Sequence, residues 1–499
     1  MNFHLTANLA LSLAAGALVP LALAPSNLWP CALISIALFW RNLKQSPNLK
    51  QAITHGLAYG LGYFGVGVSW VFVSMVNHSD THWLLALFLS LLFCIGLSLF
   101  YAAFAGLFHH FKTLHRFPTL LFAGLWISLD LLRGWLLTGF PWLYIGYGGL
   151  GTVLDGYAPI VGVHGISLVV VLSGLLVFGA RIKLHFRAAI IVSLWVVGYC
   201  LSFISWTHPS PKKPITVTLL QGNVKLEEKW LPRSLAPTLR YYMSQSYLHL
   251  ESDLIVWPET AIATYWDHVA PALSSLNDAA KMQNTQIISG TVLRKNDHPE
   301  AHYYNGLIGF GAEQGQYYKQ RLVPFGEYIP LESWLRGTIN FFNLPMSAFK
   351  LPPHAQGLLT QSLSIAGNIC YEIAYPQLVA KQAALAQVIL TVSNDTWFEH
   401  SLAPWQHLQM AQMRALENGK PVVRATNSGV SALIDATGRI TDIAPLYQSA
   451  EITGSVTLMT GQTPYNTGLN WPVFLLSMGL MLFGLRVNLS GFFPNRVKT

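Results

Sequence analysis

The stretch from Gly367 to Pro376 reads GNICYEIAYP and follows an alternating apolar run, Leu363–Ala366. This pattern predicts a buried strand that ends in a turn, with Cys370 at the carboxyl end of the strand and Glu372 just beyond it. Open α/β sheets place their chemistry at that edge. A thiol on such a turn can act as a nucleophile if an acid/base partner and an oxyanion donor lie nearby. The alternative interpretation is a buried structural cysteine.

The composition of the chain is not that of an ordinary soluble protein. Of its 499 residues, 52% are hydrophobic and 10% are charged, and the mean hydropathy is +0.40. Most of the apolar content must therefore face lipid. The formal net charge of +8 comes mainly from short links between apolar runs, which argues against nucleic-acid binding. Three of the four cysteines fall inside apolar runs, so Cys370 is the only thiol in the polar part and no disulfide framework is expected there.

Eight apolar runs are candidate membrane spans, because about 20 residues cross a bilayer. They lie near residues 6–24, 27–41, 52–76, 84–109, 118–137, 157–180, 187–206 and 471–487. The first run lacks a basic n-region and leads into further apolar sequence, so we interpret it as a retained helix and not as a cleaved signal peptide. Lys and Arg gather in alternate links and in the tail. The positive-inside rule then predicts cytoplasmic termini and places the long segment after the seventh span outside, in the periplasm of a bacterium.

The segment 208–465 has a different pattern, with shorter apolar runs that alternate with polar stretches of helical period. Helices are expected at 236–250, 270–284, 376–386 and 403–418. Strands are expected at Ile215–Leu220, Asp253–Trp257, Gln286–Val292, Tyr304–Phe310, Leu363–Ile369, Val388–Ser393, Val422–Thr426 and Ser431–Asp435. We therefore predict a membrane domain of seven helices at 1–207, one α/β domain at 208–465, and a final span with a cytoplasmic tail at 466–499.

A Gly-rich and aromatic stretch, RGWLLTGFPWLYIGYGGL, runs from Arg133 to Leu150 between the fifth and sixth spans. It fits either an aromatic belt at the membrane interface or the lining of a cavity beneath the outer domain. Asp130 and Arg133 are three residues apart near a helix end and could simply pair. An ionisable residue within the membrane is nevertheless a functional candidate.

Two further motifs place polar residues near probable strand ends. DLIVWPET holds Glu259, and YYKQRLVPFGEYIP holds Lys319 and Glu327. Glu259 alone could be a carboxylate at a helix N-terminus. Together, Glu259, Lys319 and Cys370 supply what covalent acyl transfer needs: a proton acceptor, a cation for the oxyanion and a nucleophile. The scattered His and the lone Cys lack zinc-ligand spacing such as HExxH or CxxC, so no metal site is expected.

The order WPET, YYK…VPFGE and GNICYE resembles the nitrilase superfamily, with its Glu-Lys-Cys triad. The VPFGEYIP and ICYE motifs, combined with eight spans, resemble its membrane-embedded branch, the bacterial apolipoprotein N-acyltransferases. The likeness extends over essentially the whole chain and includes RGWLLTGFPW, QGNVKLEEKW at 221–230 and MRALENGKPVVRATNSG at 413–429. It implies a multi-pass α-helical membrane domain of about eight helices and an extracytoplasmic α/β nitrilase-like domain, an αββα sandwich.

The resemblance also implies roles for individual residues. Glu259 would be the general base, Lys319 the cation that supports the oxyanion and the base, and Cys370 the acylated nucleophile. Supporting positions carried over from the motifs are Glu327, Tyr371 and Glu372 and, more weakly, Trp230 and Trp397, which could equally be packing residues.

The implied reaction occurs at the outer face of the bacterial inner membrane. A phospholipid ester would acylate Cys370, and the α-amine of an S-diacylglyceryl-cysteine apolipoprotein would then attack the thioester. No cofactor is implied, and we expect a monomer. One alternative is a membrane-tethered nitrilase-type amidohydrolase that uses water as acceptor. Another is a transporter or scaffold with an inert outer domain.

The segment 331–350 is too apolar for a purely solvated loop and carries Phe341 and Phe342. We predict that it is a mobile arm that dips into the outer leaflet and gates the entry of acyl chains. The alternative is a loop packed on its own domain or on the helices.

Overall fold

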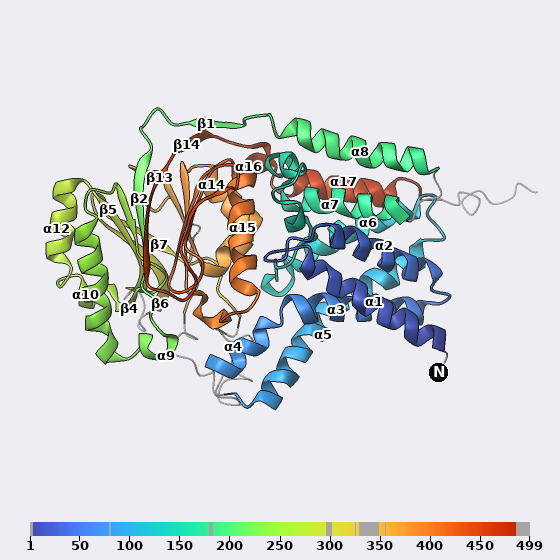
Figure 1. Cartoon of the computed structure of the whole chain (residues 1–499), viewed down its shortest axis with the longest axis horizontal. Helices are drawn as coiled ribbons and strands as arrows, with labels where there is room; N and C mark the ends of the chain where they lie inside the picture. Colours follow the sequence, from blue (N-terminus) through green and yellow to red (C-terminus); the bar gives the residue numbers. More distant parts are fainter. Residues whose placement is uncertain are drawn as a thin grey trace, which may run out of the picture.

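The computed structural model describes residues 3–78, 81–178, 183–295, 302–324, 326–328, 349–354 and 356–485. A bundle of helices and a two-sheet sandwich lie side by side, and the N-terminus is at the end of the bundle remote from the sheets (Figure 1). Phe341 and Phe342, with most of the predicted arm, lie outside the described residues. The arm therefore stays a prediction.

Every apolar run that the sequence predicts as a span contains a helix. The helices are α1 (Phe3–Leu21), α2 (Pro30–Gln45), α3 (Leu49–Gly67) with α4 (Trp70–His78), α5 (Trp83–Phe111), α6 (Pro118–Arg133), α7 (Ala158–Phe178), α8 (Leu184–Leu201) and α17 (Trp471–Leu482). Within the described residues, three helical stretches are long and apolar enough to cross a membrane: α5, α7 with the residues from Asp155 onward, and α8. The pair α3 and α4, bent by 51°, makes a fourth if it is one span. The prediction of eight spans is thus not confirmed.

Small residues let α3 approach its neighbours closely. A Cβ on Gly16 of α1 would lie 1.9 Å from the backbone oxygen of Tyr59 on α3, and one on Gly56 of α3 would lie 2.2 Å from the backbone oxygen of Tyr101 on α5. Helix association in lipid depends on such close packing because lipid tails are as apolar as the side chains. Tyr59 and Tyr101 then meet edge-to-face in the bundle core, with ring centroids 5.1 Å apart.

The second part of the molecule is the predicted α/β sandwich. One sheet has the order β13-β2-β3-β5-β6-β7, with β4 paired to β5, and the other has the order β12-β11-β10-β9-β8. The first sheet comprises β2 (Ile215–Gln221), β3 (Leu254–Val256), β4 (Ile262–Tyr265), β5 (Gln286–Lys295), β6 (His302–Gly311), β7 (Gly315–Tyr318) and β13 (Ala450–Val456). The second comprises β8 (Ile365–Ile369), β9 (Val388–Ser393), β10 (Val422–Thr426), β11 (Ala432–Ile434) and β12 (Ile440–Ile443). All the predicted strands overlap these observed ones.

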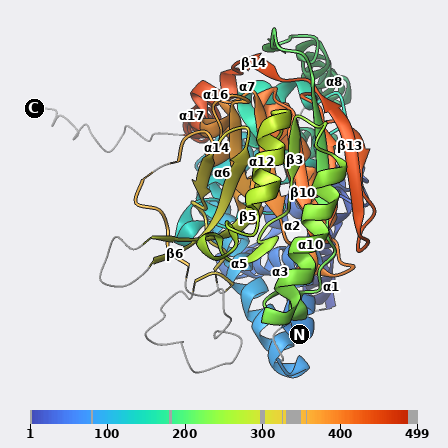
Figure 2. The same cartoon turned by 90° about the vertical axis from the view of Figure 1, so that its left-hand side faces the viewer.

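Helices cover the outer face of each sheet. The helices α10 (Pro232–Leu248) and α12 (Ser274–Gln283) flank the first sheet, and Figure 2 shows them in front of the strands with the bundle behind. The helices α14 (Pro376–Ala383) and α15 (Ala403–Asn418) flank the second sheet on the side of the bundle (Figure 1). Side chains from both sheets form one buried core between them, among them Val256, Ile288, Ile369 and Leu390.

The joint between the two parts is formed largely by α15 and by the stretch from Arg133 to Leu150. The exposed Trp135 fits the predicted belt, whereas Trp142 is buried and donates from Nε1 to Gln406 Oε1 of α15 at 2.7 Å. The belt and the cavity lining both stay predictions for this stretch. Asp130 and Arg133 do pair, at 3.0 Å. A second link is β1 (Thr207–Pro209), which pairs antiparallel with β14 (Met459–Gly461).

Candidate active site

The structure confirms the predicted strand-to-turn geometry at Cys370. Strand β8 ends at Ile369, and Cys370 begins a 3-10 turn with φ +52°, in the left-handed region that non-glycine residues rarely adopt. Two contacts hold this conformation. The Ile369 N–H donates to Glu372 Oε2 at 2.7 Å, and His407 Nε2 lies 3.1 Å from the Cys370 carbonyl oxygen, which it can only reach as a donor. Strain of this kind typically marks a functional site.

Glu259 and Lys319 also follow strands that converge on this site. Glu259 lies three residues after β3 and Lys319 directly after β7, and their side chains are 5% and 1% exposed. Lys319 Nζ lies 3.4 Å from Glu259 Oε1 and donates to Glu327 Oε1 at 2.8 Å. Asn305 Nδ2 donates to both carboxylates, at 2.8 and 2.7 Å. The second oxygen of Glu259 accepts from the Asn394 N–H at 2.8 Å. Three residues predicted from two separate motifs, Glu259 from one and Lys319 and Glu327 from the other, are thus brought together.

Electrostatics define the resting protonation of this site. Burial alone would lower the pKa of Lys319, but the carboxylates of Glu327 and Glu259 raise it above its ordinary value. Burial raises the pKa of the Cys370 thiol well above its ordinary value, Glu259 raises it further, and Lys319 opposes both. The site therefore holds an ammonium ion and a protonated thiol at neutral pH, so the thiol needs a proton acceptor before it can attack.

Glu372 connects the segment after Lys319 to the strand before Cys370. Its Oε1 accepts from the backbone N–H groups of Gln320, at 2.6 Å, and Arg321, at 3.2 Å, while Oε2 accepts from Ile369. Tyr317 Oη donates to the same carboxylate at 3.0 Å. Burial raises the pKa of Glu372 to about 7, against the opposing effect of these backbone hydrogen bonds. One buried carboxyl group thus sets the relative position of two candidate catalytic residues.

The other predicted residues lie around this centre. Tyr371 turns toward the bundle, where its hydroxyl donates to Gly139 O at 3.2 Å. Trp230 packs in a small cluster with Tyr265, Leu322 and Phe349. Trp397 lies at the contact with α4, because its carbonyl accepts from Ser74 Oγ at 2.6 Å and its ring meets His78 edge-on. Packing contacts account for the observed positions of both tryptophans.

A second cation, Lys229, was missed by sequence reasoning. It is buried, and its Nζ donates to the backbone oxygen of Glu259 at 2.9 Å. Burial lowers the pKa of Lys229 to about 8, although Glu259 and Cys370 raise it. Its position next to Trp230 in the QGNVKLEEKW motif could have indicated that Lys229 lies near the site. Lysines in a polar segment usually point to solvent, and only the fold shows that this one does not.

A buried triad of His407, Asp395 and Arg424 was also missed. His407 Nδ1 lies 3.1 Å from Asp395 Oδ1, and Arg424 Nη2 donates to Asp395 Oδ2 at 2.7 Å. Burial alone would raise the pKa of Asp395, but Arg424 and His407 hold it well below its usual range. The presence of a charged residue, Arg424, inside a predicted apolar strand could have indicated a buried ion pair. This triad fixes the ring nitrogen that faces the Cys370 carbonyl.

Nothing in the described parts of the chain suggests a metal centre: no group of three or more His, Cys, Asp or Glu side chains is arranged to hold an ion. The polar groups around Cys370 instead form an acid/base and cation set, as acyl transfer through a covalent intermediate requires.

Comparison with known proteins yields two family matches and close relatives. Residues 15–176 match the family model of the apolipoprotein N-acyltransferase N-terminal domain, and residues 216–463 match that of carbon-nitrogen hydrolase. An apolipoprotein N-acyltransferase of Pseudomonas aeruginosa is 43% identical over 486 residues, 95% of each chain. One of Photobacterium profundum is 38% identical over 492 residues, 96% of this chain and 94% of the relative. The solved structure of an amidase mutant from Nesterenkonia sp. AN1 is 16% identical, covers 53% of this chain and 98% of its own, and has a TM-score of 0.36.

Proposed function

The chain belongs to the apolipoprotein N-acyltransferase family of the nitrilase superfamily, and on that premise we propose that Cys370, Glu259 and Lys319 catalyse lipoprotein N-acylation through a thioester on Cys370. The chain is a membrane acyltransferase, as its apolar helices and relatives indicate. The relatives' names favour transfer to a lipoprotein over the amidohydrolase alternative.

In the first half-reaction, Glu259 takes the thiol proton of Cys370, and the sulfur attacks the ester carbonyl of a phospholipid. The tetrahedral oxyanion is stabilised by the Lys319 ammonium, which burial makes more effective than it would be in water. The ester C–O bond then breaks, and Glu259 returns the proton to the departing glycerol oxygen. The products are a Cys370 thioester and a lysophospholipid.

In the second half-reaction, the α-amine of an S-diacylglyceryl-cysteine apolipoprotein attacks the thioester carbonyl. Glu259 takes a proton from the attacking nitrogen and delivers it to the Cys370 sulfur as the C–S bond breaks. The result is an N-acylated lipoprotein and the free enzyme. The chain's own side chains account for every proton in this ping-pong scheme, and no cofactor enters it.

The observation that carries the proposal is the unequal sharing of Lys319 between two carboxylates. Glu327 Oε1 lies 2.8 Å from Nζ and Glu259 Oε1 lies 3.4 Å away. Because the nearer carboxylate forms the stronger ion pair, Glu327 takes most of the neutralisation. Glu259 is also the neighbouring charge that acts most strongly on the Cys370 thiol, as expected of its general base.

The proposal extends to the location of the enzyme. We place the chain in the bacterial inner membrane with both termini in the cytoplasm, the catalytic domain in the periplasm and an outer-leaflet phospholipid as donor. The distribution of Lys and Arg along the chain supports this orientation. The proposed enzyme acts as a monomer.

Intact-mass analysis of the purified chain in phospholipid tests the reaction, with Cys370→Ala as the matched variant. The wild type should gain an acyl-sized increment that Cys370→Ala does not gain. A diacylated lipopeptide with a free N-terminus should discharge it, whereas the same lipopeptide with an acetylated N-terminus should not. An increment lost equally fast in water alone would favour the amidohydrolase, and no increment under any condition would contradict the thioester.

A further inference from the structure

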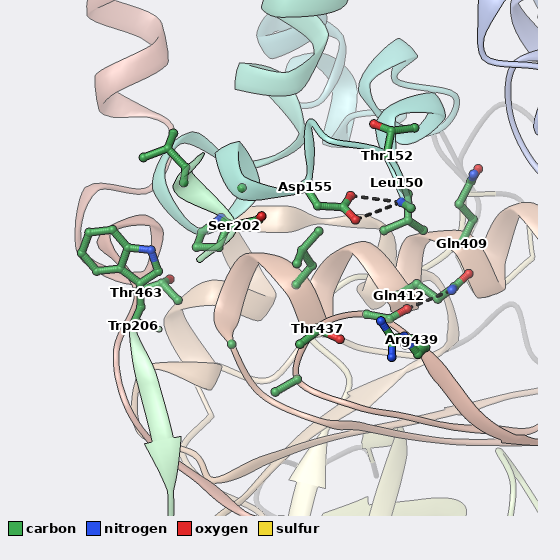
Figure 3. Close-up of a pocket in the computed structure, with 18 of the residues that line it drawn as sticks. Leu150, Thr152, Asp155, Ser202, Trp206, Gln409, Gln412, Thr437, Arg439 and Thr463 are labelled. Carbon is green, nitrogen blue, oxygen red and sulfur yellow. Dashed lines mark hydrogen bonds between the residues drawn. The ribbon is translucent and has the colours of Figure 1, made fainter. Parts of the chain in front are cut away.

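A cavity of about 940 Å³ lies at the joint between the bundle and the sandwich (Figure 3). Its walls come from the α1–α2 link, the segment 148–159, the end of α8, α15, and the turn between β11 and β12. Its volume is in the range of about 300–1,000 Å³ that is typical of ligand sites. No member of the proposed catalytic triad lines it.

The cavity and the nucleophile lie on opposite faces of α15. His407 faces the Cys370 carbonyl, whereas Gln409, Gln412 and Leu416 line the cavity. At about 100° per residue, these three positions centre on the side of the helix opposite His407. A molecule in this cavity is therefore separated from Cys370 by the full width of α15.

An acidic and a basic side chain face the cavity from different walls. Among the described residues, the Asp155 carboxyl group accepts only from the backbone N–H of Gly151, at 3.0 and 3.1 Å (Figure 3). The Arg439 guanidinium has no ion-pair or hydrogen-bond partner among the described residues, and the two side chains do not pair with each other. An unpaired carboxylate and an unpaired guanidinium in one cavity are complementary to a ligand that carries both signs of charge.

The polar side of the cavity is built in advance. Gln412 Nε2 donates to Gly438 O at 2.9 Å, which fixes the turn that presents Arg439 (Figure 3). Asp435 Oδ1 accepts from the Arg439 N–H at 3.0 Å, and Gly438 has φ +79°, a conformation that favours glycine. One turn earlier on α15, Gln409 bonds to the α1–α2 link and to the segment before α7. The backbone turn that carries Arg439 is therefore held by α15.

The apolar side of the cavity opens toward lipid. Only 6% of the apolar stretch of α8 is buried within the protein, whereas 78% of the corresponding stretch of α7 is buried. Leu201 and Ile204 at the end of α8 line the cavity, as does Trp29, and Ile204 and Trp29 are 47% and 38% exposed. An exposed tryptophan beside aliphatic side chains is typical of the membrane interface. Acyl chains can therefore lie along α8 while their headgroup reaches Arg439.

We propose that this cavity binds one zwitterionic glycerophospholipid that is not the acyl donor. Its phosphate binds Arg439, its ammonium group binds Asp155, and its chains lie along α8. Arginine suits phosphate because its planar donors match the phosphate oxygens. An anionic headgroup without the amine would meet Arg439 but would be repelled by Asp155. This lipid fills the joint beneath α15, and its binding requires a membrane but not the thioester mechanism.

Photo-crosslinking of the full-length chain tests the site. The background is Cys370→Ala, so that no lipid is consumed, and the probe is phosphatidylethanolamine with a diazirine in one acyl chain. Peptide mapping should find adducts in the last turns of α8 and in residues 202–207 that follow it, because the chains lie along this helix. Arg439→Gln should lower this labelling about tenfold, whereas Lys281→Gln, an exposed lysine on α12, should leave it unchanged.

A headgroup comparison makes the test specific for charge. Asp155→Asn should lower labelling by the phosphatidylethanolamine probe but raise labelling by a matched phosphatidylglycerol probe, because it removes a repulsive carboxylate. Equal labelling of Arg439→Gln and Lys281→Gln would overturn the proposal. So would adducts confined to other peptides, or a response to Asp155→Asn that is the same for both lipids.

Discussion

Replacement of Glu372 by glutamine tests whether the link between Lys319 and Cys370 sets the rate of acylation. The carboxylate of Glu372 accepts from Gln320 and Arg321 through Oε1 and from Ile369 through Oε2. Glutamine keeps the shape but replaces one oxygen by a donor, so at least one buried backbone N–H loses its acceptor. An unsatisfied buried group costs about 1–3 kcal/mol, and we expect a loss of unfolding free energy of that size.

The acylation rate of Glu372→Gln should be affected more strongly than its stability. If the Lys319 segment shifts by about 1 Å relative to Cys370, the rate should fall about 100-fold, the typical cost of such a misplacement. The direct measurement is single-turnover acylation of Cys370 followed by intact mass. The free energy of unfolding is measured on the same samples.

The pH dependence of stability gives an independent readout. Burial raises the pKa of Glu372 from an ordinary value of 4.5 to about 7. Between these values the folded chain binds more protons than the unfolded chain, so this group makes the folded state less stable as pH rises from about 4.5 to 7. The effect is at most about 3 kcal/mol, from 1.36 kcal/mol per pKa unit. Since glutamine does not titrate, the stability advantage of the wild type over Glu372→Gln should shrink over that interval.

Glu313→Gln is the matched control. Glu313 is a partly exposed carboxylate at the other end of β7, and it accepts from the backbone N–H groups of Gln361 and Ser362. The same change there should leave the acylation rate unaltered. A wild-type acylation rate in Glu372→Gln, or an equal loss of rate in both variants, would refute the role of Glu372 as the link.

Three further variants probe the charges around Cys370. Lys319→Met should raise the pKa of the Cys370 thiol further, since Lys319 lowers it. Alkylation of Cys370 by iodoacetamide at pH 8 should then slow about tenfold per pKa unit. An unchanged alkylation rate would show that Lys319 is not the cation that acts on the thiol. His407→Ala removes the donor to the Cys370 carbonyl and should lower single-turnover acylation at least about tenfold with an unchanged phospholipid KM, whereas equal changes in both constants would indicate a general loss of fold. Lys229 loses its charge as pH rises through about 8, so the kcat of the wild type should fall as pH rises through that value. The kcat of Lys229→Met should show no such fall. A fall that persists in the variant would have to come from the titration of another group.

The positions of Glu259 and Cys370 could be predicted because each follows an apolar run that ends at a polar motif. Such runs are set by local pattern, and the strands they predict were observed as β3 and β8. Lys319 follows β7, a short strand that the sequence pattern did not predict, so only its motif singled it out. Neither an apolar run nor a motif predicted that Lys229 lies at the site. Its burial results from contact with a segment far away in the chain, at the Glu259 carbonyl, and local pattern carries no information about such contacts.

The eight predicted membrane spans are not confirmed for a related reason. The apolar run at 471–487 continues past the end of α17 at Leu482, where the chain turns at Gly484 with φ +109°. The run at 52–76 is divided between α3 and α4 by a bend of 51°. Hydropathy averages over such turns, because an apolar residue scores equally in a helix and in the bend that ends it. Run length therefore overestimated helix length.

The arrangement around α15 explains why both parts belong to one chain. Its His407 faces the Cys370 turn, its Gln406 accepts from Trp142 of the bundle, and its Glu417 accepts from the Val163 N–H beside the break in α7. Nearly every residue of this helix is buried, including Met410 and Met413 in the core shared with the bundle. A sandwich cut from the bundle would expose that apolar face and release the helix that holds the Cys370 carbonyl. The membrane part therefore supports the candidate active site structurally as well as anchoring the chain.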